Sequence, residues 1–353
     1  MLVRNSRVVV TGGAGFIGSH LVDLLLGRSN EVTVIDDFSS GSPANLAHVE
    51  NHKGLRVVEA DIRREDLLSE LMRGADFVFH LATRSVRLSL VQPTVVHEVN
   101  TTGTLNVLKA AAQARVRRLL YCSSSEVNGT ADVVPMPEDY HFRPETIYGA
   151  SKLAGEYYSL VFHRSGWLQT VIARPHNNYG PREHYIGFKG EVIPRFILWA
   201  RAGKPLTIYG DGRQTRDFTY VTETVDYLVR LMECDSAVGQ VFNVCRGEEV
   251  SIREIAERIV RLTGERSEIV HLPGRPNDVL RLFGDPTKMR GRLGSSPRIS
   301  IDDGLQRTIE WFQGHVALTP EVMDSLPIAT WARDTVESWM GDLSSQGHAR
   351  RAG

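Results

Sequence analysis

Short apolar runs alternate with longer amphipathic segments through the first half of the chain. Six runs rich in β-branched and aromatic residues predict strands: RVVVTGG at 7–13, EVTVIDDF at 31–38, LRVVEAD at 55–61, DFVFHLA at 76–82, RRLLYCSSS at 117–125 and QTVIARP at 169–175. The segments between them carry apolar residues at helical spacing. Strands that are apolar throughout and alternate with helices are typical of a parallel sheet covered on both faces. The sequence therefore predicts an α/β fold with a doubly wound, parallel sheet of the Rossmann type.

The pattern loosens after about residue 175, where prolines and a Gly-Asp-Gly turn at 210–212 separate short elements. We expect residues 1–176 to form the Rossmann-type domain. Residues 177–216 and 245–340 are expected to form a smaller C-terminal α/β lobe that holds the substrate. The segment 217–244 contains a helical pattern and the strand-like VFNV, so we expect it to return to the first domain. Residues 341–353 are polar and small and are expected to form a disordered tail.

Composition narrows the class of protein. At 353 residues the chain is longer than one typical core supports, which agrees with two domains. The formal charge of −1 gives no general positive field, so nucleic acid is not an expected partner. No apolar run approaches the roughly 20 residues of a membrane helix, and no secretory leader pattern precedes the first strand, so we expect a soluble, cytoplasmic protein. Cys122, Cys234 and Cys245 are widely spaced, which indicates neither a disulfide framework nor a metal site.

A glycine-rich turn follows the first predicted strand and opens a helix. Gly12, Gly15 and Gly18 stand in TGGAGFIG, the context in which backbone N–H groups and the helix dipole hold a pyrophosphate. The second strand ends in Asp36 and Asp37, and a carboxylate there accepts hydrogen bonds from the adenosine ribose and repels a 2′-phosphate. The sequence therefore predicts an NAD site in residues 1–176, with NAD favoured over NADP. Asp61 ends the third strand and is expected near the adenine.

A phenol and an ammonium group stand four residues apart in YGASK, at Tyr148 and Lys152. At the start of a helix this spacing places both side chains on one face. A free tyrosine loses its proton only near pH ~10, whereas a base for a sugar hydroxyl is wanted near neutrality. The charge of Lys152 and of an oxidised nicotinamide would favour the phenolate. The pair therefore predicts a catalytic base.

The segments TGGAGFIGSH, HLAT, CSSSEVNG, YGASK, RPHNNYGP and YGDGRQTRDFTYV resemble the extended short-chain dehydrogenase/reductases that modify nucleotide sugars, over roughly residues 5–315. The resemblance implies that NAD oxidises C4 of the sugar, with Tyr148 as base, Lys152 at the nicotinamide ribose and Ser124 at the 4-oxygen. Asn100 would support the active-site helix. The residues expected at the cofactor are Gly12, Gly15, Phe16, Ile17, Gly18, Asp36, Asp37, Asp61, Ile62, Leu81, Ala82, Tyr148 and Lys152.

The resemblance also implies a set of substrate contacts and a homodimer formed through helices that include the one bearing Tyr148. Guanidinium groups suit the oxygens of a nucleotide diphosphate, and the residues expected around it are Asn177, Arg195, Arg216 and Arg275. A sugar carboxylate would meet arginines in the loops after the fourth and sixth strands. Those candidates are Arg84, Arg87 and Arg182, with Ser125 beside the sugar.

The series Ser124-Ser125-Glu126 is most similar to that of the UDP-glucuronate decarboxylases, which produce UDP-xylose or its 4-keto form. Glu126 would be a fourth catalytic residue. It counts against a simple 4-epimerase, which needs no second base, and Ser125 counts weakly against a 4,6-dehydratase. Asn128 and Arg84 depart from the usual family pattern, so both of those alternatives stay open. A non-catalytic NAD-sensing protein is the fourth, disfavoured because Tyr148 and Lys152 are both present.

Overall fold

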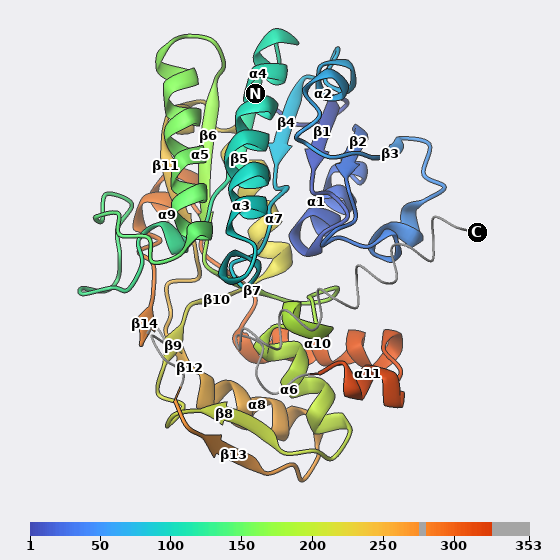
Figure 1. Cartoon of the computed structure of the whole chain (residues 1–353), viewed down its shortest axis with the longest axis vertical. Coiled ribbons are helices and arrows are strands. Elements are labelled where there is room, and N and C mark those ends of the chain that lie inside the picture. The colour runs from blue at the N-terminus through green and yellow to red at the C-terminus, as the bar shows by residue number, and fades with distance from the viewer. Residues whose placement is uncertain (275–279, 327–353) are drawn as a thin grey trace.

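The computed structural model describes residues 1–274 and 280–326 (Figure 1). Within these residues, seven parallel strands form one sheet in the order β3-β2-β1-β4-β5-β6-β11. All six strands predicted from the first half are present, and VFNV adds the seventh. Their bounds are β1 Arg7–Thr11, β2 Glu31–Asp36, β3 Leu55–Glu59, β4 Phe77–His80, β5 Arg118–Cys122, β6 Thr170–Pro175 and β11 Val241–Val244. The predicted Rossmann-type α/β fold is confirmed.

The strand order reverses between β1 and β4. Strands β2 and β3 are added on one side of β1, whereas β4, β5, β6 and β11 are added on the other. β1 and β4 pair in parallel, with Thr11 opposite His80 at their carboxyl ends. Chain segments that leave neighbouring strands at this point diverge to opposite faces of the sheet, which opens a crevice for ligands.

Helices cover both faces of the sheet, because successive strand residues point to opposite sides. Val8 and Val10 of β1 lie in the core shared with α1 (Phe16–Leu26) and α7 (Val221–Glu233). Val9 lies in the core on the other face. That face is covered by α2 (Glu65–Leu71), α4 (Thr104–Gln113) and α5 (Ile147–Arg164), and a short α3 (Pro93–His97) runs through a π-helical turn (Glu98–Gly103) into α4.

The smaller lobe lies beyond the carboxyl ends of the strands and has its own apolar core (Figure 1). Its elements are the parallel pair β8 (Leu206–Tyr209) and β13 (Ile269–Leu272) and the helices α6 (Val192–Arg201), α8 (Ile252–Thr263), α10 (Ile301–His315) and α11 (Pro320–Asp324). Helices α6 and α8 pack against β8, and α10 packs against both of these helices. Short strands connect the lobes: β7 (Asn177–Tyr179) pairs with β10 (Phe218–Tyr220), and β9 (Thr215–Arg216) pairs with β12 (Val250–Ser251) and β14 (Arg281–Leu282).

One helix of the predicted substrate lobe packs on the large sheet instead. Helix α9 (Thr287–Leu293) falls in the range 245–340, yet Met289 is buried in the same core as Phe242 and Val244 of β11. Lys288 donates to the carbonyl of Val241 over 2.8 Å. The physical reason is that β11 is an edge strand whose apolar side chains need cover. The tail predicted at 341–353 lies outside the described residues.

The described residues contain neither a membrane-spanning helix nor a metal-binding cluster. No helix in them is long and apolar enough to cross a membrane. No cluster of three or more His, Cys, Asp or Glu residues that could bind a metal ion occurs among them. The three cysteines are free thiols. Short 3-10 turns connect the main elements at Pro43–Val49, Leu88–Leu90, Ser125–Val127, Gly187–Lys189 and Asp235–Ala237.

A buried histidine connects β1, β4 and α4 beneath the crevice. The ring of His80 is fully buried, with Nδ1 2.7 Å from Oγ1 of Thr11 and Nε2 2.9 Å from Oγ1 of Thr104. Thr104 donates its own proton to the carbonyl of Asn100, so Nε2 of His80 must donate and Nδ1 must accept. Burial, together with the charge of Lys152, lowers the pKa of His80 to about 3. The ring is therefore neutral in the folded protein.

We predict that His80 couples stability to pH. Its folded pKa lies below the unfolded value of ~6.5, so its contribution is complete above pH ~6.5 and is lost as the pH falls toward 3. Between these two pKa values the unfolded protein binds up to one more proton at His80 than the folded protein does. The His80→Asn variant should lack this difference. The slope of the unfolding free energy against pH, measured by urea denaturation between pH 6 and 4, should fall by up to about 1.4 kcal/mol per pH unit. His97→Asn, at an exposed position, is the matched control. An unchanged slope in His80→Asn would show that this ring does not bind the proton.

Candidate active site

A cavity of about 640 Å³ lies at the carboxyl ends of the sheet strands, between the large domain and the smaller lobe. Its wall begins with the residues that follow β1, β2, β4, β5 and β6 and extends to α6, β8 and the start of α8. This is a typical size for a cofactor or small-molecule site. The predicted site residues in its wall are Gly12, Gly15, Phe16, Ile17, Gly18, Asp36, Asp37, Asp61, Ile62, Leu81, Ala82, Arg84, Arg87, Ser124, Ser125, Glu126, Tyr148, Lys152, Asn177, Arg195 and Arg216.

The glycine turn after β1 is built for close backbone contact. Gly12 has a φ of +73°, and a Cβ atom there would lie 2.7 Å from the amide nitrogen of Ala82. A Cβ atom on Gly18 would lie 2.1 Å from the carbonyl oxygen of Gly12. Helix α1 then begins with Gly15 at its N-cap and no side chain capping it. The N-terminus of α1 at the cavity wall therefore fits the pyrophosphate of a dinucleotide.

Asp36 and Asp37, at the end of β2, lie in the cavity wall, and the sequence predicts the adenosine ribose beside them. Asp36 accepts hydrogen bonds from the amides of Ala14 and Phe38, each over 2.9 Å. Burial raises the pKa of Asp36, although these two amides act in the opposite direction. Asp37 accepts from Nη2 of Arg84 over 2.9 Å. Asp61 lies farther along the wall, where it is held by the guanidinium of Arg63.

Tyr148 and Lys152 are placed by the start of α5. Thr146 caps this helix by accepting from the amide of Gly149 over 3.0 Å, which puts Tyr148 in the first turn. Lys152 lies one turn later and donates to the carbonyl of Cys122, at the end of β5, over 2.5 Å. Two α5 glycines allow the helix to approach this region closely: a Cβ on Gly149 would lie 2.5 Å from the carbonyl of Glu126. At Gly155 it would lie 2.3 Å from the hydroxyl of Tyr121.

The titration of the Tyr148 and Lys152 pair is dominated by burial. It raises the pKa of Tyr148 above its usual value, and the hydrogen bond from Ser124 only partly opposes this. Burial also lowers the pKa of Lys152 to about 8. Lys152 was expected to lower the pKa of the phenol, yet in the protein alone its ammonium faces Cys122 and lies 4.6 Å from the ring centre of Tyr121. Forming the phenolate therefore calls for further positive charge, which an oxidised nicotinamide carries.

The Ser-rich end of β5 brings Glu126 beside this pair. Ser124 caps the short turn Ser125–Val127 by accepting from the amide of Glu126 over 3.3 Å. Glu126 is half-buried in the cavity wall, and burial raises its pKa, although the charge of Arg216 opposes the rise. Its charge adds to the effect of burial on Tyr148. A phenol, a hydroxyl and a carboxyl group thus face one cavity.

Four of the residues predicted to contact the substrate lie in the cavity wall. Asn177, Arg195, Arg216 and Ser125 line the cavity. The side-chain oxygen of Asn177 is buried and has no hydrogen-bond partner in the described part of the chain, so a ligand donor would satisfy it. Asn100 supports the site as expected: its amide donates to Ser151 of α5 over 3.1 Å and its oxygen accepts from the amide of Arg84 over 2.7 Å.

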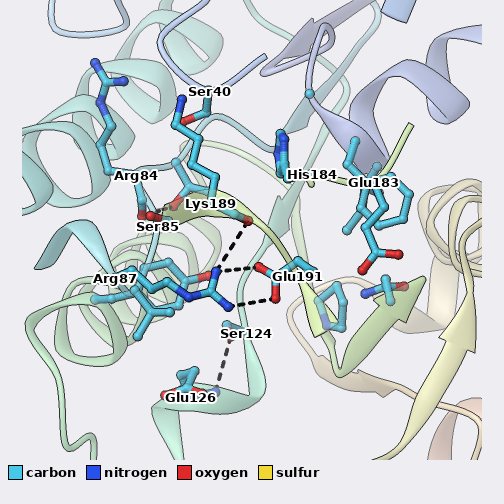
Figure 2. Close-up of a pocket in the computed structure, with 18 of the residues that line it drawn as sticks. Ser40, Arg84, Ser85, Arg87, Ser124, Glu126, Glu183, His184, Lys189 and Glu191 are labelled. Carbon is cyan, nitrogen blue, oxygen red and sulfur yellow. Dashed lines mark hydrogen bonds and ion pairs between the residues drawn. The ribbon is translucent and has the colours of Figure 1, made fainter. Parts of the chain in front are cut away.

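Two predicted sugar contacts lie elsewhere. Arg182 does not line the cavity, because its guanidinium contacts Asp23 and His20 of α1 over 2.6 and 2.7 Å. Arg84 lines it but is held on the adenosine side by Asp37, and Figure 2 shows it pointing away from Arg87. In each case a carboxylate of the protein already pairs with the guanidinium. Arg275 lies outside the described residues.

The structure adds charged residues that the sequence interpretation missed. The segment ahead of α6 brings Glu183, His184, Lys189 and Glu191 to the cavity wall (Figure 2). Glu191 binds Arg87 through both carboxylate oxygens, over 2.9 and 3.0 Å. Lys189 donates to the carbonyl of Ser39 over 2.6 Å. The only sequence signal was the density of charged residues after RPHNNYGP, which says nothing of their partners.

Comparisons with known proteins identify the family. The model of the NAD dependent epimerase/dehydratase family matches residues 8–245, and the chain belongs to that family. UDP-glucuronic acid decarboxylase 1 from Danio rerio is 36% identical over 312 residues, covering 87% of this chain and 72% of the relative. UDP-glucose 4-epimerase from Mycolicibacterium smegmatis is 38% identical over 310 residues, covering 87% and 98%.

A solved structure represents the third activity. It is the dTDP-glucose 4,6-dehydratase from Streptomyces venezuelae with NAD bound, which has a TM-score of 0.83 and 32% identity over 90% of this chain and 99% of that one. Decarboxylase, epimerase and dehydratase relatives thus stand at similar identity. What they share is NAD-dependent chemistry on a nucleotide sugar, and this chain is an enzyme of that kind. The predicted NAD cofactor is confirmed.

We predict that Tyr148→Phe abolishes turnover and leaves NAD binding nearly intact, because only the proton acceptor is removed. Product formation from UDP-glucuronate, UDP-glucose and dTDP-glucose should be followed by mass spectrometry, and NAD affinity by calorimetry. Retention of about a tenth of the wild-type rate would contradict the assignment of Tyr148 as base.

We also predict that the enzyme prefers NAD to NADP by at least about tenfold, because the Asp36 carboxylate repels a 2′-phosphate. Asp36→Asn keeps an acceptor for the amides of Ala14 and Phe38 but removes the charge, so the preference for NAD over NADP should become smaller. Calorimetric titration of both dinucleotides measures this. Equal affinities in the wild-type protein would overturn the prediction.

Proposed function

We propose that this enzyme is an NAD-dependent nucleotide-sugar decarboxylase that oxidises C4 of UDP-glucuronate and releases carbon dioxide. The product would be UDP-xylose, its 4-keto form, or both. The observation that carries the proposal is the position of Glu126: a carboxyl group with a raised pKa shares the cavity with Tyr148 and directly follows Ser124 and Ser125.

NAD, when bound, would supply the hydride acceptor for C4. Tyr148 would accept the proton of the C4 hydroxyl, and Ser124 would donate a hydrogen bond to the same oxygen. The resulting β-keto acid loses carbon dioxide when the bond from C5 to the carboxyl carbon breaks and its electron pair moves toward the C4 oxygen. Ser124 and the protonated Tyr148 would stabilise that charge. The raised pKa of Glu126 suits it to return a proton to C5.

The alternatives make different demands on the same residues. Epimerisation rotates a keto sugar and needs no carboxyl group at position 126. Dehydration needs an acid for the departing hydroxyl as well as a base at C5, and the neighbour of Glu126 is Ser125, whose hydroxyl is a weak acid. Decarboxylation needs no acid for a departing hydroxyl and no base to remove the C5 proton. It needs only a group that returns a proton to C5, a role that Glu126 could fill. The decarboxylase relative from Danio rerio supports this choice, and the presence of Ser124, Tyr148 and Lys152 in one cavity supports catalysis over NAD sensing.

A 4,6-dehydratase is the second candidate, and a specific observation favours it. Arg87 is already paired with Glu191, Arg84 with Asp37 and Arg182 with Asp23. Three arginines expected to meet a sugar carboxylate thus have carboxylate partners within the protein, as a site for a neutral sugar would. The dehydratase from Streptomyces venezuelae supports this alternative.

A homodimer remains part of the proposal. Helix α5, which carries Tyr148 and Lys152, also exposes three large apolar side chains, those of Ile147, Tyr157 and Val161. An apolar face on this helix is suited to pairing with a second copy of the chain.

The deciding experiment is incubation of the NAD-loaded enzyme with UDP-glucuronate, UDP-glucose and dTDP-glucose, with products identified by mass. Decarboxylation removes carbon dioxide, dehydration removes water, and epimerisation leaves the mass unchanged. Untouched UDP-glucuronate together with loss of water from a neutral hexose would replace the decarboxylase proposal by the dehydratase one.

We predict that Glu126→Gln lowers the rate on UDP-glucuronate by roughly 10²-fold, the scale of one lost acid–base group, and preserves nucleotide affinity. Glu145→Gln is the matched control, because Glu145 is a nearby but exposed carboxylate. A loss of affinity with an unchanged maximal rate would make Glu126 a binding residue only.

A further inference from the structure

The pair formed by Arg87 and Glu191 bridges the two lobes inside the cavity. Arg87 precedes the short turn Leu88–Leu90 after β4, and Glu191 is the N-cap residue of α6 in the smaller lobe. The two guanidinium Nη atoms lie 2.9 and 3.0 Å from the two carboxylate oxygens, as Figure 2 shows. This is the two-pronged geometry in which arginine binds a carboxylate most strongly.

The pair lies close to the reacting groups. Tyr148 packs in an apolar cluster with Leu88, the neighbour of Arg87, and with Phe188 from the segment that leads to Glu191. After burial and Glu126, the charge of Glu191 is among the influences that raise the pKa of Tyr148. The pair therefore borders the part of the cavity in which Tyr148 would meet a sugar.

The side chains of the two partners differ in their exposure to solvent. The side chain of Arg87 is 18% exposed, whereas that of Glu191 is 44% exposed, on the open side of the pair. Burial works to raise the pKa of Glu191, but the charge and hydrogen bonds of Arg87 outweigh it, with smaller contributions from His184 and Arg195. Glu191 is therefore the more solvent-accessible partner of the pair, and the guanidinium of Arg87 is the main group that stabilises its charge.

A second carboxyl group, that of Glu183, lies nearby but is held differently. Glu183 is buried and accepts from the amide of Gly180 over 3.3 Å. Burial, together with the charge of Glu191, raises its pKa well above the usual value. Glu191 is the carboxylate that binds Arg87 through both of its oxygens, and it occupies the position that a carboxylate ligand would take.

We propose that Arg87 binds the carboxylate of a uronic acid sugar and that Glu191 occupies this place until the substrate displaces it. The proposal rests on the proposed function, because it takes the substrate to be a uronate. It assigns the recognition of the sugar carboxylate to one arginine and gives the opposing carboxylate a role in selectivity. The exchange replaces one ion pair at Arg87 by another, so a uronate gains no additional pair and binds more weakly than it would without Glu191. A neutral sugar does not displace Glu191, so its affinity is unaffected.

Binding measurements test this directly. Dissociation constants of the NAD-loaded protein for UDP-glucuronate, UDP-glucose and UDP should be measured by calorimetry for the wild type, Glu191→Gln, Arg87→Gln and the double variant. Removing the competing charge in Glu191→Gln should lower the dissociation constant of UDP-glucuronate by about tenfold, the scale of one charge-assisted pair. Arg87→Gln should raise that constant by about tenfold or more. The dissociation constants of UDP-glucose and UDP should change by less than about twofold in both variants.

Arg84→Gln is the matched control, because it removes a guanidinium from the same loop that Asp37 holds on the adenosine side. It should leave the ratio of UDP-glucuronate to UDP-glucose affinity unchanged. Thermal unfolding shows whether each variant is folded. If Arg87→Gln does not fold, the Glu191→Gln titration decides alone.

Equal changes for the acidic and neutral sugars would overturn the proposal and make the pair a structural bridge between the lobes. So would weaker UDP-glucuronate binding in Glu191→Gln. Carbon dioxide release is measured separately with wild-type enzyme. Selective uronate binding without carbon dioxide release would refute the decarboxylase function and keep the role of Arg87. Carbon dioxide release by the wild type, together with an unchanged ratio of the two affinities in Arg87→Gln, would refute the role of Arg87 and keep the decarboxylase function.

Discussion

The parallel pairing of β1 with β4 is the constraint on which the rest of the site depends. It places Thr11 opposite His80 and brings the turn at Gly12 against the backbone of Ala82, so closely that no side chain fits between them. Because the strand order reverses here, loops from both halves of the sheet end at the same crevice. The cofactor glycines, the serines after β5 and the loop carrying Arg87 meet for this reason.

Helix α5, which carries Tyr148 and Lys152, is held to the sheet by charged groups that would be costly to bury without a partner. Glu156 of α5 binds Arg174 of β6 through two contacts of 2.7 Å, with side chains only 2% and 1% exposed. Removing one partner of such a pair leaves an uncompensated buried charge. Together with the close approach of Gly155 to Tyr121, the pair fixes how far α5 lies from β5. That distance sets the position of Tyr148 relative to Ser124 and Glu126.

Electrostatics in the cavity favour neutral groups until a ligand enters. Burial raises the pKa of Tyr148 and Glu126 and lowers that of Lys152. The charged groups that remain are largely paired within the protein, as with Arg84 and Asp37 or Arg87 and Glu191. Chemistry that needs a phenolate therefore depends on charge brought by the cofactor. If the substrate is a uronate, as we propose, its recognition depends on exchange of an existing ion pair.

The sequence by itself determined the seven strands of the large sheet, the glycine turn of the cofactor site and the placement of Tyr148 and Lys152 on one helix face. Each follows from side-chain periodicity or turn chemistry over a few residues, and such local rules hold wherever the segment lies. Only the tertiary structure decided that α9 covers β11, that Arg182 binds α1 outside the cavity, and that Arg87 faces Glu191. The two arginine contacts join residues that lie about a hundred or more positions apart in the chain. The position of α9 depends on which strand lies at the edge of the sheet and needs cover. A charged side chain takes whichever opposite charge the fold brings within reach, and no local pattern records that partner.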